Sequence, residues 1–200
     1  MNKYAILRTE KLKSAASVWR SLKHAFREQP TPNADPDKAA KNEHVGAASA
    51  AEAMQKVRDR LPEKRRKDAV LAIEYLITAS PDALANMTEE QRKAYFSDSL
   101  KYLEAKHGKE NIVAANIQRD ESTQHLVVYA VPLVQTAERT RRRSVIVGTN
   151  PDGTKRRETR EFTEKASSKL SAAEFLDGPA KLSRMQTNFA KEVGAKHGLE

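Results

Sequence analysis

One carboxylate stands in the middle of an apolar segment. Glu74 interrupts residues 69–78, an otherwise apolar run with the length and composition of a buried strand. A carboxylate removed from water needs a cation, a metal or a histidine as its partner. Glu74 is therefore the first candidate for a chemical role.

Three further polar side chains lie where one apolar run ends and the next begins. Gln118 ends the run 111–118, His125 lies at the start of the run 124–131, and Glu121 lies in the loop between them. Amide, carboxylate and imidazole can together bind a divalent ion. The alternative is that Glu121 is an ordinary loop acid, because one histidine alone makes a sparse ligand set.

Strand geometry links these candidates. Side chains alternate between the two faces of a strand, so Glu74 shares a face with Ala72 and Leu76, and His125 shares one with Val127. If Glu74, Gln118 and His125 face the same side of one sheet, they form a polar island. The sequence leaves open whether they do.

Composition narrows the function classes. The chain has no cysteine, which excludes disulfides, a thiol nucleophile and zinc–thiolate or iron–sulfur sites. It has 36 Lys and Arg against 27 Asp and Glu, and the resulting net charge of +9 favours an anionic partner such as nucleic acid. No apolar run reaches the roughly 18–20 residues that a membrane span needs. With no signal peptide visible either, a soluble cytoplasmic protein is expected.

The elements that must position these groups follow from periodicity, capping boxes and turn residues. We expect an α+β fold, with a mainly antiparallel central sheet, helices packed on one face and a basic β-hairpin inserted into the single domain 1–200. The expected strands cover 3–8, 69–78, 111–118 and 124–131, the expected helices cover about 14–27, 49–61, 88–107 and a stretch from 179, and the expected hairpin covers 139–163.

Basic residues gather in two places. One is the run 64–67 and the other is the hairpin 139–163, where eight basic residues face two acidic ones over 139–160. Such residues can form a plain solvated surface, or they can neutralise phosphates. We expect DNA contacts from Arg27, Lys64, Arg65, Arg66, Lys67, Arg141, Arg142, Arg143, Arg156 and Arg157.

Several segments carry a resemblance to a known family. The most specific is Arg119-Asp120-Glu121-Ser122-Thr123-Gln124-His125, and the end of the first helix, His24-Ala25-Phe26-Arg27, also matches. Further matches lie at 4–8, 32–36, 61–70, 95–98 and 185–190. Through them the chain resembles the Pre/Mob relaxases, also called plasmid recombination enzymes, over nearly its whole length. The hairpin alone looks like an insertion.

The resemblance implies a function. A relaxase of this kind nicks one strand at a plasmid origin of transfer, stays attached to the 5′ phosphate and uses Mn²⁺ or Mg²⁺. The family pattern implies His24 as the nucleophile and Glu74 and Glu121 as catalytic carboxylates. It places Gln118, Glu121 and His125 around the metal. The implied partner is plasmid DNA, as an origin single strand or hairpin, and any dimerisation segment would lie beyond residue 200.

The sequence departs from the family pattern at the metal. The first metal histidine is replaced by Gln118 and the last by Val127. An amide oxygen is a weaker ligand than imidazole for such ions, so metal binding is expected to be weakened. Two alternatives therefore stand beside the active nickase: an impaired relaxase-like module that holds origin DNA without cutting, and a protein that reuses the fold without binding DNA.

Overall fold

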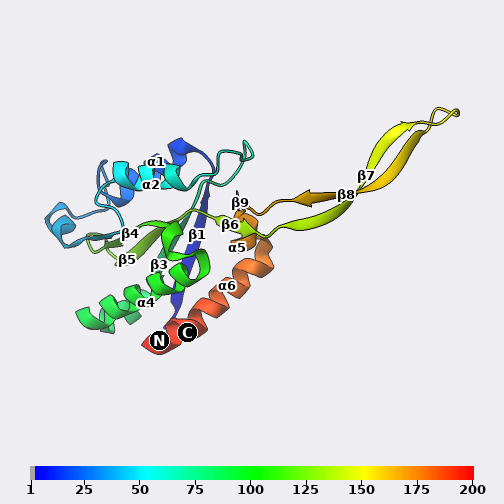
Figure 1. Cartoon of the computed structure of the whole chain (residues 1–200). Helices are drawn as coiled ribbons and strands as arrows, with labels where there is room; N and C mark the ends of the chain where they lie inside the picture. Colours follow the sequence, from blue (N-terminus) through cyan, green and yellow to red (C-terminus); the bar gives the residue numbers. More distant parts are fainter. Residues whose placement is uncertain (1–2) are drawn as a thin grey trace. The chain divides into compact units, whose positions relative to one another are not determined.

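The computed structural model describes residues 3–200, which divide into two compact units. Unit 1 comprises the described part of 1–133 together with 170–200, and unit 2 comprises 134–169. Unit 1 is built on a five-stranded antiparallel sheet with the order β1-β3-β5-β4-β2 (Figure 1). Its strands are β1 (Ala5–Leu12), β2 (Glu43–Val45), β3 (Ala72–Ala79), β4 (Ile112–Gln118) and β5 (His125–Ala130). The predicted α+β class with an antiparallel sheet is confirmed.

Helices cover both faces of this sheet, so the prediction of helices on one face was wrong. Buried residues of α1 (Ala15–Ala25) and α2 (Ala50–Arg60) pack with Val127 and Tyr129 of β5. Those of α4 (Glu89–His107) and α6 (Gly178–Glu192) pack on the opposite face, with Leu126 and Val128. The reason is that the central strands are apolar on both faces, and each face must be removed from water.

Local signals set the helix ends. Thr88 and Gln91 form the predicted capping box at the start of α4, and Gly108 ends that helix with a φ of 84°, which favours glycine. Ser14 and Ser17 form a second capping box at α1. At α2 the Ser49 hydroxyl accepts from the backbone N–H of Glu52, which is half of the expected capping box, while the Glu52 carboxylate accepts from the backbone N–H of Ala48 instead of Ser49. The short helices α3 (Pro81–Asn86) and α5 (Ala172–Phe175) and the short strand β2 were not predicted.

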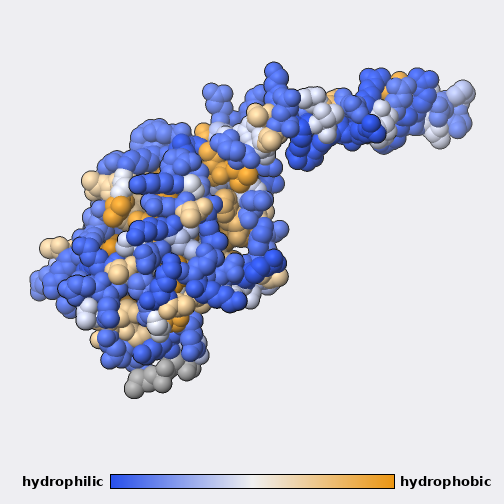
Figure 2. Space-filling view, turned by 60° about the horizontal axis from the view of Figure 1, so that its bottom comes forward, coloured by the Kyte–Doolittle hydropathy of each residue, from blue (hydrophilic) through white to orange (hydrophobic). Residues whose placement is uncertain are grey.

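Unit 2 contains the predicted hairpin, made of β7 (Arg139–Thr149) and β8 (Lys155–Glu164). The short strands β6 (Leu133–Thr136) and β9 (Ser167–Leu170) pair next to it in the chain. The hairpin surface is hydrophilic over most of its length (Figure 2). Among residues 3–200, no helix has the length and apolar character needed to cross a membrane.

Candidate active site

The strand register brings the three polar strand residues onto one face of the sheet. Gln118 of β4 lies directly opposite His125 of β5, and Glu74 of β3 lies opposite Tyr129, two residues along β5 from Val127. Tyr129 and Val127 belong to the face that α1 and α2 cover. The polar island that alternation made conceivable therefore exists, beneath α1.

The end of α1 is tied to the loop between β4 and β5 by one arginine. Arg27 Nε and Nη2 each donate to Asp120 at 2.7 Å, and Nη2 also donates to Glu121 at 2.8 Å. The Asp120 side chain has no exposed surface, and the hydrogen bonds from Arg27 hold its pKa below the usual range. Arg27 has a φ of 55°, a left-handed conformation that turns the chain sharply after the helix.

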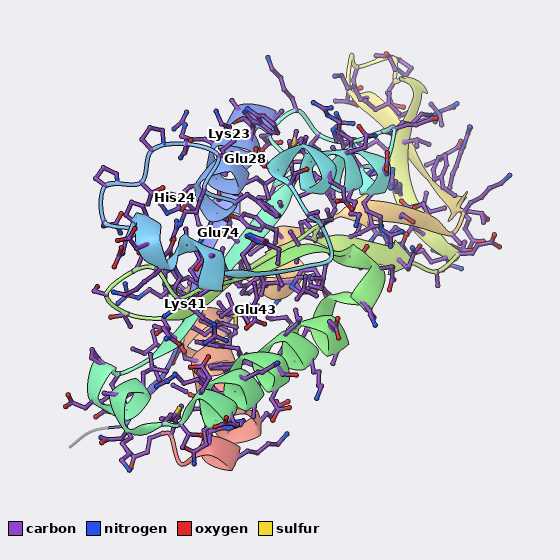
Figure 3. The ribbon with its side chains drawn as sticks, turned by 90° about the vertical axis from the view of Figure 1, so that its left-hand side faces the viewer. Lys23, His24, Glu28, Lys41, Glu43 and Glu74 are labelled. Atoms are coloured by element: carbon purple, nitrogen blue, oxygen red, sulfur yellow. The ribbon has the colours of Figure 1, made fainter. Side chains whose placement is uncertain are left out.

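His24 lies beside this ion-pair network. Its Nε2 is 3.9 Å from Glu121 Oε1, and its side chain is 44% exposed, so it is open to a ligand. Burial of part of the ring, followed by the nearby Arg27 charge, lowers the pKa of His24 below 6.5. At neutral pH the imidazole is therefore uncharged, which is the nucleophilic form. Figure 3 labels His24 at the end of α1 and Glu74 on the strand beneath that helix.

Glu74 is held by a hydroxyl pair. The Ser21 hydroxyl donates to Glu74, and Ser21 Oγ also lies 2.7 Å from the hydroxyl of Tyr129. Burial raises the pKa of Glu74 above its ordinary value. Ser21 is three residues before His24 on α1, so the hydrogen bond from Ser21 to Glu74 fixes this helix over the sheet one turn before the histidine.

Gln118 and His125 present two donor atoms that fit a divalent cation. His125 Nδ1 lies 2.9 Å from the carbonyl oxygen of Thr123, an arrangement that places the proton on Nδ1 and the lone pair on Nε2. Gln118 Nε2 donates to the carbonyl of Ala25 at 3.1 Å, while its Oε1 is buried without a hydrogen-bond partner. An imidazole nitrogen and an unpaired amide oxygen suit Mn²⁺ or Mg²⁺ as part of a ligand shell.

Glu121 is engaged elsewhere. Its Oε1 accepts from Arg27 and its Oε2 accepts from Asn33 at 2.9 Å. Across the described residues 3–200, no group of three or more His, Asp or Glu side chains could hold a metal ion. The protein thus offers two donor atoms from Gln118 and His125, and Glu121 lies beside the histidine of α1.

Residues of the polar loop 29–46, whose length and composition are typical of functional or mobile loops, complete the site. Asn42 donates to Asp120 at 2.8 Å and accepts from the backbone of Arg119 at 2.7 Å. His44 of β2 lies opposite Asn116 on the same sheet face, and its Nδ1 is 2.5 Å from Asn116 Oδ1. The available signal was the density of asparagine and aspartate in a long loop.

A cleft of about 620 Å³ adjoins Glu121. Its wall includes Lys38, Lys41 and Arg119 together with Glu43, and Figure 3 labels Lys41 and Glu43 in this region. Arg119 is buried and pairs with Glu43 at 2.8 Å. Arg119 also pairs with Glu89 at 2.8 Å. Three carboxylates, from Glu43, Glu89 and Glu121, line the cleft beside the three cations, so the cleft is polar and carries charges of both signs.

The remaining predicted DNA contacts lie outside this cluster. Lys64, Arg65, Arg66 and Lys67 lie in an exposed loop between α2 and β3, where Arg66 is 3.9 Å from Asp68. The hairpin arginines Arg141, Arg142, Arg143, Arg156 and Arg157 belong to unit 2 and are exposed. The structure shows that all are accessible to a large anionic ligand.

Curated proteins of known family resemble this chain in sequence. A plasmid recombination enzyme from Bacillus thuringiensis is 32% identical over 81 residues, which cover 40% of this chain and 18% of the relative. A 65 kDa protein from Zymomonas mobilis is 27% identical over 198 residues, covering 96% of this chain and 29% of the relative. The chain thus spans less than a third of the length of these relatives.

Solved structures share the fold. The MobM relaxase domain, in a Mn-bound crystal structure with plasmid pMV158 oriT DNA, superposes with a TM-score of 0.69 at 22% identity. The superposition covers 98% of this chain and 88% of that domain. The family model for the plasmid recombination enzyme, Mob_Pre, matches residues 1–200. The chain therefore belongs to the Mob_Pre family of plasmid recombination enzymes.

Proposed function

We propose that this chain is the DNA-nicking domain of a plasmid mobilisation relaxase, with His24 as the nucleophile. The observation that carries the proposal is the position of His24: a half-exposed, neutral imidazole 3.9 Å from Glu121, whose carboxylate Arg27 holds in place. Related MobM structures hold oriT DNA and Mn, which supports the same class of substrate and ion for this chain.

The geometry suggests how the residues act on a phosphodiester. Glu121 on the Nε2 side favours the proton on that nitrogen and leaves the lone pair on Nδ1. The imidazole attacks phosphorus, a nitrogen–phosphorus bond forms, and the bond from phosphorus to the 3′ oxygen breaks. The leaving 3′ oxygen takes a proton from water to become a 3′ hydroxyl, and Glu121 stabilises the positive charge that develops on His24. Attack by that hydroxyl in the reverse direction rejoins the strand.

The other residues position this nucleophile. Arg27 fixes Glu121 and also donates through Nη1 to the carbonyl of His24 at 3.1 Å. Glu74 holds α1 through Ser21, so of the two predicted catalytic carboxylates Glu121 is the one at the histidine and Glu74 sets the position of the helix. Gln118 and His125 would hold a divalent ion. When bound, such an ion polarises the scissile phosphate and neutralises charge that builds on it.

The test is formation of a covalent adduct. Supercoiled plasmid carrying the origin region next to this gene is incubated with the protein and Mn²⁺, Mg²⁺ or EDTA, then resolved on denaturing gels. The wild-type chain should give metal-dependent open circles with protein on one 5′ end, and His24→Ala should give none while still binding DNA. Lys23→Ala, one residue away on α1, serves as the matched control and should form the adduct. Adduct of normal yield from His24→Ala would remove histidine 24 from the nucleophile role.

A second function is favoured by the ligand count. With glutamine at 118 and valine at 127, the protein supplies two donors where the family pattern has more, which fits a module that holds origin DNA without cutting. The two functions differ in a simple measurement. Mn²⁺ raises the melting temperature by mass action only when a competent site binds it.

A further inference from the structure

The hairpin of unit 2 is a long two-stranded ribbon with almost no core. Its strands pair in antiparallel register from Arg139 opposite Glu164 to Thr149 opposite Lys155. At roughly 3.4 Å per residue, an eleven-residue strand is about 37 Å long, close to one turn of B-form DNA. An isolated ribbon of this kind is only marginally stable in water. Because it has almost no core, its residues are better explained by contacts with a ligand than by packing within the hairpin.

Positive charge is concentrated in this unit. Residues 134–169 contain ten basic and five acidic residues, so a net charge of +5 out of the chain's +9 lies in 36 of 200 residues. Figure 2 shows the corresponding hydrophilic surface. The distribution along the ribbon, however, is not uniform.

Near the base of the ribbon the arginines are paired. Arg139 lies 2.9 Å and Arg141 3.6 Å from Glu164, and Arg143 contacts the same carboxylate. Arg142 donates to Glu161 on the other face of the ribbon at 2.8 Å. These arginines hold the two strands together, and much of their charge is compensated within the hairpin.

Near the tip the cations are free. Lys155, Arg156 and Arg157 are exposed at the start of β8, and across the described part of the chain no carboxylate lies within ion-pair distance of them. The turn at 150–153 beside them bonds within itself through Asn150 and Thr154. The tip therefore presents three uncompensated positive charges.

We infer that these three tip cations contact the phosphates of duplex DNA, an inference that rests on the proposed DNA-nicking function. A two-stranded ribbon fits the major groove of B-form DNA, whereas the deep, narrow major groove of an RNA helix does not admit it. Single-strand binding uses aromatic platforms for the bases, and Phe162, near the base, is the sole aromatic residue among 134–169. Contacts to phosphates position a protein on the duplex and carry no sequence information by themselves.

The experiment measures binding of the full chain to a fluorescent mixed-sequence 24-base-pair duplex, in EDTA, over a range of NaCl concentrations. The tip variant carries Lys155→Gln, Arg156→Gln and Arg157→Gln. Loss of three phosphate contacts should make the slope of log K against log salt less negative by about 2.7. Three contacts at about 0.9 log unit per decade of salt amount to about 2.7 log units between 1 M and 0.1 M salt, so at 0.1 M the affinity should fall by about 500-fold.

Two further variants distinguish a contact of the tip cations with DNA from a general effect of net charge. Lys93→Gln, Lys109→Gln and Lys191→Gln together remove the same charge from exposed helix and turn positions of unit 1, and should leave the slope within about one of wild type. Arg156→Lys with Arg157→Lys keeps the charge and should keep the duplex affinity. An equal loss of duplex affinity in the tip variant and the unit 1 variant would overturn the inference. A tip variant that binds duplex as tightly as wild type would also overturn it.

The outcome is independent of nicking, because EDTA and an unrelated duplex are used. A wild-type chain that forms no adduct, but whose duplex affinity depends on the tip, refutes the proposed nickase and supports the tip contact. A chain that nicks normally but whose tip variant binds duplex unchanged refutes the tip contact alone. Stronger loss on single strands than on duplex would also refute the assignment to duplex DNA.

Discussion

Replacing Arg27 by methionine removes the charge that links α1 to the loop after β4 while keeping a side chain of similar length. Arg27 makes three hydrogen bonds of 2.7 to 2.8 Å to the carboxylates of Asp120 and Glu121. The Asp120 side chain is fully buried, so the variant leaves a carboxylate out of water with Asn42 as its remaining side-chain donor. Breaking a buried ion pair on one side costs about 3–5 kcal/mol, and we expect a loss of that size in the free energy of unfolding at pH 7.

The deficit should depend on pH in a defined direction. In the wild type the pKa of Asp120 is depressed by Arg27, so its contribution to stability is present above pH 3.8 and is lost only as pH falls through the lower folded value. In the variant the unpaired buried carboxylate has a raised pKa and protonates as pH falls. The difference between the two proteins should therefore be largest near pH 7 and smaller at pH 4.

Urea unfolding followed by circular dichroism at both pH values measures this. Arg20→Met, an exposed position on the same helix, is the control and should change the free energy of unfolding by less than about 0.5 kcal/mol. Adding Asp120→Asn to Arg27→Met should recover part of the loss, because the uncompensated charge is gone. A deficit below about 1 kcal/mol at pH 7, or one of equal size at pH 4, would show that this network does not hold the site together.

Three other changes have defined outcomes. Ser21→Ala removes the donor to the buried Glu74 and should lower the free energy of unfolding by about 1–3 kcal/mol in urea titrations; a change near zero would contradict the anchoring role. Gln118→His should strengthen Mn²⁺ binding, and each tenfold gain in affinity should add about 1.4 kcal/mol to the stabilisation by Mn²⁺. The shift in melting temperature on adding Mn²⁺ measures this, and the control Gln124→His should show no such gain. Burial lowers the pKa of His107 from 6.5 to about 4, so the folded protein favours the neutral ring. The free energy of unfolding of the wild type should therefore fall by on the order of 3 kcal/mol between pH 6.5 and pH 4. His107→Gln should remove that part of the pH dependence in chemical denaturation, and an unchanged profile would assign the acid sensitivity to other groups.

The composition of the sheet face could be predicted because alternation is a local property of a strand. Glu74, Gln118 and His125 lie on one face as their positions in the apolar runs allowed. The β3 strand begins at Ala72, three residues later than predicted, because the chain turns at 67–68, where the backbone N–H of Ala69 donates to the carbonyl of Arg66. The apolar character of 69–71 reflects packing in a loop, which periodicity does not distinguish from a strand.

The partners of the site could not be predicted because they are far apart in sequence. Arg27 meets Asp120 across 93 residues, and Asn33 meets Glu121 across 88. The sequence places Asp120 in a turn-rich loop. Its carboxylate is buried because α1 packs over the sheet and brings Arg27 to it. The helices α4 and α6 were predicted, but not the face that they cover, because the chain position of a helix does not say on which side of the sheet it packs.

The strand order has a consequence for synthesis of the protein. β3 and β5, neighbours in the sheet, are separated in sequence by α3, α4 and β4, and β2 pairs with β4 after an interval of more than 60 residues. At about 5–20 residues per second, roughly 5–20 s pass between synthesis of His24 and synthesis of Glu121. During that interval α1 has no sheet to cover and the histidine no carboxylate beside it. The site around His24 is therefore assembled only after His125 has left the ribosome, and a chain arrested earlier exposes the amphipathic helix α1.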